Sequence, residues 1–167
     1  DTIQLVHLNT AVGFDLDSSY ESMGTLGLDR AANARAVLSE DSDSNWLIID
    51  VGTCITTDWV ESGTFTGGSI APGIDLRLRS MYAGTANLPY PENWRELAAE
   101  GVGLHLGTNT IECMKSGIFW GYVGLVKEIC NRIIMEHGQP MDIIGTGGLA
   151  QLFSQDEKIF NALFSSF

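Results

Sequence analysis

The sequence predicts an α/β domain in which a mixed sheet is flanked by helices. Three strand-like segments, 46–50, 54–61 and 64–71, follow one another across short turns and are rich in apolar, β-branched and aromatic residues. Helical patterns lie before and after them, and a short apolar strand at 141–144 follows late in the chain. The short turns indicate that the first three strands form an antiparallel meander.

The other elements are predicted from apolar spacing and from turn residues. In chain order they are a strand at 3–8, a polar turn at 18–25, a helix at 26–40, an acidic loop at 40–45, a helix at 74–82, a loop at 84–94, a helix at 110–137 and a helix at 149–167. Gly138 and Pro140 end the long helix. Its apolar residues cover more than one face, so core or subunit packing is expected there.

The chain is strongly acidic. Its 167 residues include 21 Asp and Glu against 9 Lys and Arg, which gives a formal net charge of −12. Nucleic acids and anionic membranes bind proteins through Lys and Arg, so this charge disfavours both as partners. The length and the 44% of hydrophobic residues suit one domain with its own core. We therefore expect a soluble cytoplasmic protein that binds small molecules.

The three cysteines, Cys54, Cys113 and Cys130, are widely spaced and form no C-x-x-C motif. This pattern argues against a disulfide framework or a zinc site and suits a reducing compartment. No apolar run is long enough to span a membrane.

The stretch LIIDVGTCITTDWV (47–60) ends a strand in a carboxylate and follows it with a glycine turn and hydroxyls. Backbone N–H groups at Gly52 and the hydroxyl of Thr53 could hold a nucleotide phosphate, and Asp50 could hold a cation or position its waters. The alternative is a plain β-turn in which the aspartate caps its own backbone.

Three other segments combine glycines with polar residues. Segment 67–73 (GGSIAPG) permits close backbone approach, and segment 145–148 (GTGG) places backbone N–H groups before a predicted helix. In segment 27–30 (GLDR), Asp29 could be a general base and Arg30 an anion clamp. Ordinary glycine connections and a surface Asp-Arg ion pair are the alternatives.

Taken in this order, these segments resemble the type III pantothenate kinases of the acetate-kinase, sugar-kinase, Hsc70 and actin superfamily. The matching residues are Tyr20, Leu26 to Arg30, Asp50 to Thr56, Gly67 to Gly73, Leu88-Pro89, Thr110, Ser116-Gly117 and Thr146 to Gly148. The resemblance implies an α/β, ribonuclease-H-like fold of the actin-like ATPase type.

The resemblance also implies an activity, namely ATP-dependent phosphorylation of pantothenate to 4′-phosphopantothenate, the first step of coenzyme A biosynthesis. It makes Asp29 the catalytic base and Asp50 the ligand of a monovalent cation, K⁺ or NH₄⁺. The substrate-binding residues that it implies are Tyr20, Gly27, Leu28, Asp29, Arg30 and Thr110. Those implied for ATP with Mg²⁺ are Gly52, Thr53, Thr146, Gly147 and Gly148. Members of the family form homodimers, and helix 110–137 is the interface expected here.

One family motif has no counterpart. Residues 1–19 contain no Asp-x-Gly-Asn-Thr loop, which is the family's first phosphate clamp. We therefore expect residues 1–45 to be the end of the N-terminal half, with the acceptor-binding helix, and 46–167 to be a C-terminal ribonuclease-H-like half that is incomplete at its end. Because such electrostatic contacts contribute several kcal/mol, the 167 residues alone should be weak or inactive. The alternatives are another kinase of the superfamily and a non-catalytic or regulatory homologue.

Overall fold

The computed structural model describes residues 14–99, 106–138, 140–153 and 162–163. Its sheet has the strand order β3-β2-β1-β4-β5. The strands are β1 (Trp46–Val51), β2 (Cys54–Glu61), β3 (Thr64–Pro72), β4 (Asp142–Thr146) and β5 (Ala162–Leu163). The pairs β1–β2 and β2–β3 are antiparallel, whereas β1–β4 and β4–β5 are parallel. This mixed sheet, a meander extended by parallel strands, is the ribonuclease-H-like arrangement of actin-like ATPases and confirms the predicted fold class.

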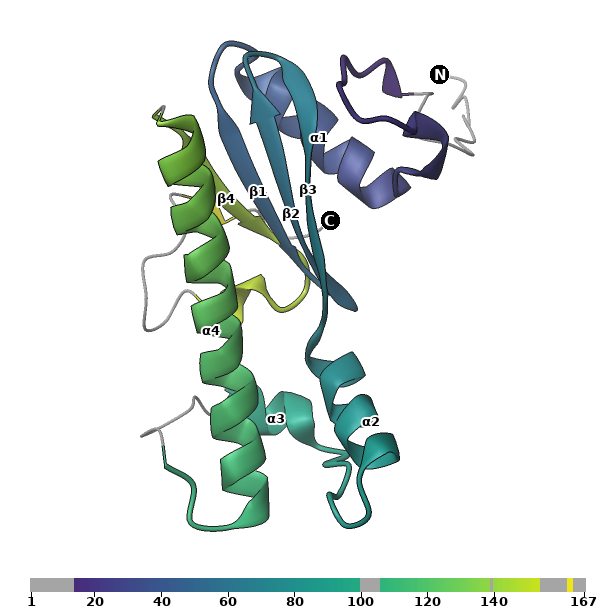
Figure 1. The fold of residues 1–167 in the computed structure, drawn as a ribbon, viewed down its shortest axis with the longest axis vertical. Helices are drawn as coiled ribbons and strands as arrows, with labels where there is room; N and C mark the ends of the chain where they lie inside the picture. Colours follow the sequence, from purple (N-terminus) through teal and green to yellow (C-terminus); the bar gives the residue numbers. More distant parts are fainter. Residues whose placement is uncertain (1–13, 100–105, 139, 154–161, 164–167) are drawn as a thin grey trace, which may run out of the picture.

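Helices cover both faces of the sheet (Figure 1). The long α4 (Thr110–His137) crosses one face, and α1 (Leu28–Glu40), preceded by the 3₁₀ helix η2 (Met23–Thr25), covers the other. Helices α2 (Ile74–Gly84) and α3 (Trp94–Ala99) contribute to the core on the α4 side, and a 3₁₀ helix η3 (Ala150–Phe153) follows β4. The central strands β1 and β2 are thus largely buried, whereas the edge strand β3 is partly exposed.

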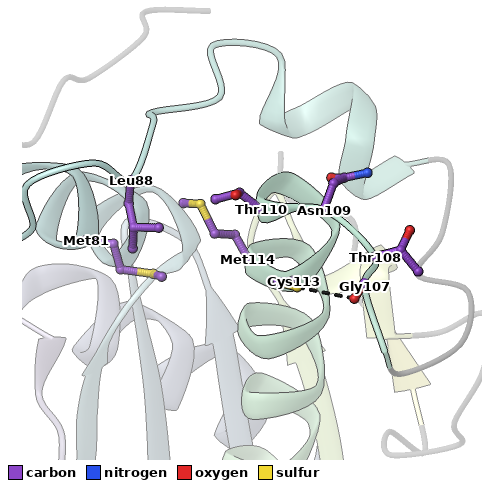
Figure 2. A pocket seen from close by; sticks show the side chains of 8 residues that line it. All are labelled: Met81, Leu88, Gly107, Thr108, Asn109, Thr110, Cys113 and Met114. Atoms are coloured by element: carbon purple, nitrogen blue, oxygen red, sulfur yellow. Dashed lines mark hydrogen bonds between the residues drawn. The ribbon is translucent and has the colours of Figure 1, made fainter.

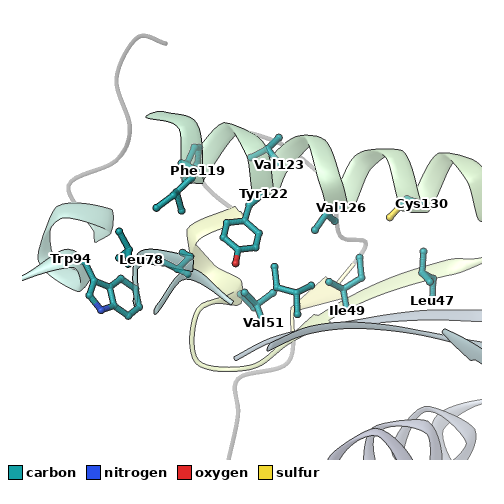
Figure 3. Close-up of a cluster of buried hydrophobic side chains, with 14 of the residues drawn as sticks. Leu47, Ile49, Val51, Leu78, Trp94, Phe119, Tyr122, Val123, Val126 and Cys130 are labelled. Carbon is teal, nitrogen blue, oxygen red and sulfur yellow. The ribbon is translucent and has the colours of Figure 1, made fainter. Parts of the chain in front are cut away.

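The alternation of β1 decides which side chains meet which helix. Leu47, Ile49 and Val51 lie in the core on the α4 side, where Tyr122 and Val126 reach them (Figure 3). Residues 48 and 50 lie on the α1 side. There Ile48 packs in a second cluster with Ala31, Ala34 and Val37 of α1. The small alanines, which are fully buried, let α1 approach the sheet closely.

Most predicted elements are confirmed, and two of them match their bounds to the residue, β2 and α4. The side chain of Asn109 caps α4 by accepting a hydrogen bond from the Glu112 amide, and Gly138 ends it with a left-handed φ of 63°. Helix α3 was not expected from the apolar spacing.

The predicted helix at 149–167 is wrong. The chain forms the short η3 and then β5, which pairs in parallel with Ile144 and Gly145. Pairing with the edge of β4 gives the backbone N–H and C=O groups of β5 hydrogen-bond partners, which the spacing of apolar residues along the chain cannot predict. This pairing outweighs the local helical pattern. Residues 154–161 and 164–167 of that prediction, and the predicted strand at 3–8, lie outside the described residues.

The three cysteines are free thiols. Over the residues that the structure describes, no helix is long and apolar enough to cross a membrane. The same residues contain no group of three or more His, Cys, Asp or Glu side chains placed to hold a metal ion.

The core on the α4 side should be sensitive to lost volume. We expect Leu47→Ala, at a side chain with 0% exposure, to lower the free energy of unfolding by about 2–5 kcal/mol. Ile134→Ala, on α4 with 41% exposure, should cost less than about 1 kcal/mol. Urea denaturation measures both, and equal losses would contradict this assignment of the core.

Candidate active site

Asp50 stands at the carboxyl end of the central strand, between two threonines. It is in register with Thr56 on β2 and with Thr146 on β4. Residues in register share a face of the sheet, so these three side chains lie on the α1 side. The Asp50 Oδ2 atom accepts a hydrogen bond from Asn33 Nδ2 of α1 at 3.0 Å. The amide of Asn33 therefore orients the Asp50 carboxylate.

The Asp50 carboxylate is partly withdrawn from water. Burial raises its pKa, the hydrogen bond from Asn33 works in the opposite direction, and the negative charge of Asp29 raises the pKa further. The negative charge of Asp50 is therefore only partly compensated by its neighbours in the described chain.

The loop after β4 lies directly against Asp50. Gly147 has a φ of +90°, and a Cβ atom there would stand 2.4 Å from Asp50 Oδ1 and 2.6 Å from the carbonyl oxygen of Val51. The amide of Leu149 donates to that same carbonyl at 3.1 Å. Only a glycine permits this approach, while Gly148 is open and exposed. The backbone of 146–148 thus forms one wall of the site.

The turn between β1 and β2 forms a neighbouring wall. The Gly52 amide donates to the carbonyl of Cys54, and the Gly73 amide donates to the carbonyl of Thr53, both at 2.9 Å. A Cβ atom at Gly73 would stand 2.3 Å from that Thr53 oxygen, so the glycine-rich segment 67–73 ends packed on this turn. The side chain of Thr53 is exposed and is available to a ligand.

The first turn of α1 carries Asp29. Gly27 occupies the N-cap position without any side-chain cap, and Asp29 Oδ1 accepts from the Arg30 amide at 2.9 Å. The Asp29 side chain is exposed, yet its charge raises the pKa of both Asp50 and Asp58. Asp29 also lies one helical turn before Asn33, whose amide donates to Asp50, so it stands at the rim of the site that Asp50 lines.

Arg30 forms a buried ion pair with Asp58 of β2. Its Nε and Nη2 atoms donate to Asp58 Oδ1 at 2.8 and 2.5 Å, and the two side chains are 6% and 0% exposed. Burial works to lower the pKa of Arg30, but the hydrogen bonds and charge of Asp58 outweigh it and the pKa is raised. The surface Asp29–Arg30 ion pair considered from the sequence is wrong, because Arg30 is buried and pairs with Asp58.

Tyr20 lies beside this pair. Its ring centroid is 5.8 Å from Arg30 Cζ and 5.8 Å from the ring of Phe65. The predicted residues Tyr20, Gly27, Leu28, Asp29 and Arg30 thus meet at the start of α1. Leu28 is 38% exposed there.

Thr110 lies elsewhere. It begins α4, and with Met81, Leu88 and Met114 it lines a pocket of about 490 Å³ (Figure 2). Helix α4 and α1 cover opposite faces of the sheet (Figure 1), so one chain does not bring Thr110 to Asp29.

Two residues of this region were missed from the sequence, Asn33 and Asp58. Asn33 follows Asp29 by four residues and so shares its helix face, and Asp58 follows Thr56 by two and so shares its strand face. Both spacings were visible, but only the packing of α1 on the sheet gives them partners.

Comparison with known proteins assigns the family. The model of the type III pantothenate kinase family matches residues 2–132. The chain belongs to this family. A type III pantothenate kinase of Ruegeria pomeroyi is 44% identical over 137 residues, which are 81% of this chain and 50% of the relative. One of Jannaschia sp. is 42% identical over 139 residues, 83% of this chain and 51% of that protein. The chain therefore spans about half the length of the curated relatives it matches.

A solved structure shares the fold of this pantothenate kinase family member. A Baf family protein from Campylobacter jejuni aligns with a TM-score of 0.57 at 20% identity, over 90% of this chain and 61% of that one. At this identity, the likeness concerns the fold.

The wall at 146–148 can be tested by adding one methyl group. Gly147→Ala combines a positive φ with the close contact to Asp50, so we expect it to lower the free energy of unfolding by about 1–3 kcal/mol. The adjacent Gly148→Ala meets no atom within 4 Å and should stay within about 0.5 kcal/mol of wild type. Chemical denaturation compares them; equal effects would contradict this geometry.

The raised pKa of Asp50 makes the free energy of unfolding depend on pH. Because the folded chain favours the protonated form, ionisation of Asp50 destabilises it as pH rises above the ordinary Asp value of about 3.9 and through the raised folded value. Asp50→Asn should therefore be more stable than wild type near neutral pH, and the difference should vanish in acid.

Urea denaturation from neutral to acidic pH measures this difference in buffers without K⁺ or NH₄⁺, since a bound cation would favour the ionised form. The exposed Glu21→Gln serves as control and should match wild type within about 0.5 kcal/mol. An Asp50→Asn variant that is less stable at neutral pH contradicts the predicted sign.

Proposed function

We propose that these residues form part of a kinase that transfers the γ-phosphoryl group of ATP to the hydroxyl of pantothenate, giving 4′-phosphopantothenate. The observation that carries the proposal is the position of Asp50 at the carboxyl end of β1, against the backbone of 146–148 and bonded to Asn33, which lies one helical turn after Asp29 on α1. Phosphoryl transfer needs positioning and charge stabilisation more than covalent chemistry by the protein, and these are the parts present.

In this proposal Asp29 accepts the proton of the pantothenate hydroxyl. Its exposed carboxylate at the start of α1 is accessible to an acceptor, and general-base catalysis of this kind contributes about 10²–10⁴-fold. Tyr20, Gly27 and Leu28 would line the acceptor site around it. Where turnover is measurable, replacing Asp29 should remove this factor.

ATP with Mg²⁺ would lie along the two backbone walls, the Gly52-Thr53 turn and the loop from Thr146 to Gly148. Mg²⁺ is commonly held by one or two carboxylates together with substrate phosphates, so a complete protein cage is not required. Asp50 would hold the monovalent cation, K⁺ or NH₄⁺, because its desolvated and oriented carboxylate fits a cation.

We also propose that the protein is a cytoplasmic homodimer without nucleic-acid or membrane partners. Thr110 supports a dimer, because it is on the α4 side and would contact an acceptor at Asp29 only from a second copy. Ile134 and Met135, 41% and 79% exposed near the end of α4, offer apolar surface for such an interface.

The proposal includes a division at residue 45, with the acceptor-binding helix before it and the ribonuclease-H-like half after it. It also includes weak turnover by the 167 residues alone, because they contain no Asp-x-Gly-Asn-Thr loop. A non-catalytic or regulatory homologue is the second candidate, and the burial of Arg30 against Asp58, which withdraws this guanidinium from a ligand, is the observation that favours it.

The test is isothermal titration of the purified chain with pantothenate and, separately, with ATP, Mg²⁺ and K⁺, followed by a product assay. We expect pantothenate to bind and turnover to stay far below the roughly 1–100 s⁻¹ of kinases. Turnover in that range would refute the expectation that the 167 residues alone have weak activity. A folded chain that binds neither ligand would refute the kinase proposal and favour the non-catalytic homologue.

A further inference from the structure

Asp58 was not singled out by its sequence, yet it is the most deeply buried charged side chain near the candidate site, with 0% exposure. We propose that Asp58 is a positioning residue. Its ion pair with Arg30 holds the first turn of α1 in place, and this positions Asp29 and Tyr20. In this proposal Arg30 has a structural role and does not bind the carboxylate of the acceptor. This inference rests on the proposed function.

The geometry of the pair shows where the Arg30 guanidinium is directed. Two of its nitrogen atoms donate to the same oxygen of Asp58, and Arg30 is 5% exposed. The other oxygen, Asp58 Oδ2, accepts from Thr56 Oγ1 at 3.4 Å. A cation held in this way has its charge balanced inside the protein and is a poor clamp for an anionic ligand outside it.

Neighbouring residues restrict the movement of the Arg30 and Asp58 side chains. A Cβ atom at Gly68 would stand 1.8 Å from the carbonyl oxygen of Thr57 and 2.9 Å from Asp58 Oδ1. On the other side, Arg30 Cζ lies 5.8 Å from the ring of Tyr20 and 5.7 Å from that of Phe65. Tyr20 is therefore positioned by the same guanidinium that Asp58 holds.

The first turn of α1 needs such an anchor. Its N-cap, Gly27, has no side chain to satisfy the free amides, and Asp29 Oδ1 accepts from the amide of Arg30 itself. Helix ends fray when they lack caps and packing. An ion pair from the third residue of the helix to the middle of β2 ties this turn to the sheet directly below Asp29.

Arg30 could either position the protein chain or bind the acceptor's carboxylate, and only the second role makes binding depend on the charge of the acceptor. We would titrate wild type and Asp58→Asn with pantothenate and with pantothenol, in which an alcohol replaces the carboxylate. If Arg30 positions the site, the substitution weakens both ligands by the same factor, up to on the order of 100-fold. If Arg30 clamps the carboxylate, releasing it from Asp58 strengthens pantothenate relative to pantothenol, and the proposal is overturned.

Amide hydrogen exchange followed by NMR gives a readout that needs no ligand. In Asp58→Asn we expect protection to fall at residues 31–34, whose amides donate to the carbonyl groups at the start of α1, more than in the core of β1. Uniform loss over the whole chain would overturn positioning and leave a general contribution to stability. Glu128→Gln, which breaks the exposed pair with Arg132, is the matched control and should leave both exchange and binding unchanged.

A second variant protects the test against failure to fold. Replacing both partners, Arg30→Met with Asp58→Leu, removes the buried charges together, which commonly preserves or raises stability. Positioning predicts that this folded variant still binds both ligands weakly by the same factor, whereas selective loss of pantothenate would identify a clamp. If wild type binds neither ligand, the proposed function fails, and the exchange measurement still decides whether Asp58 anchors α1.

Discussion

The site depends on the pairing of β1 with strands on both of its edges. The meander places β2 on one edge, and the parallel β4 occupies the other. Since the two neighbours are in register with Asp50 through Thr56 and Thr146, the end of the central strand collects polar groups from three strands.

Strand β1 is buried on both faces, but the two faces carry different kinds of side chain. Toward α4 the strand presents only apolar side chains, and these join a core that includes Tyr122 and Val126. Toward α1 it presents Ile48 and then Asp50, so the apolar contact gives way to a polar site within two residues. The small side chains Ala31 and Ala34 bring α1 near enough for Asn33 to bond Asp50.

Negative charge in this region is costly and is only partly neutralised. Burial raises the pKa of Asp50 and of Asp58, and Asp29 adds repulsion to both. Arg30 compensates Asp58 through two hydrogen bonds, whereas Asp50 has the neutral amide of Asn33. Stability given up in this way is typical of functional sites, where an external cation or substrate supplies the missing charge.

The local sequence pattern alone predicted those helices and strands whose apolar spacing and terminal residues lie within or next to the element itself. The period and the capping residues of 110–137 predicted α4 to the residue, and the turn residues around 54–61 did the same for β2. The candidate site was predicted as separate glycine and carboxylate segments, because glycines and polar residues at strand ends are local features.

The amino-acid sequence by itself determined the family and most secondary structure, since motifs and spacing are written along the chain. Only the tertiary structure decided that Arg30 pairs with Asp58, that Asn33 orients Asp50, that 162–163 forms a strand, and that Thr110 lies across the sheet from Asp29. These are contacts between distant segments, and their free energy depends on burial and register, which exist only after the chain has folded.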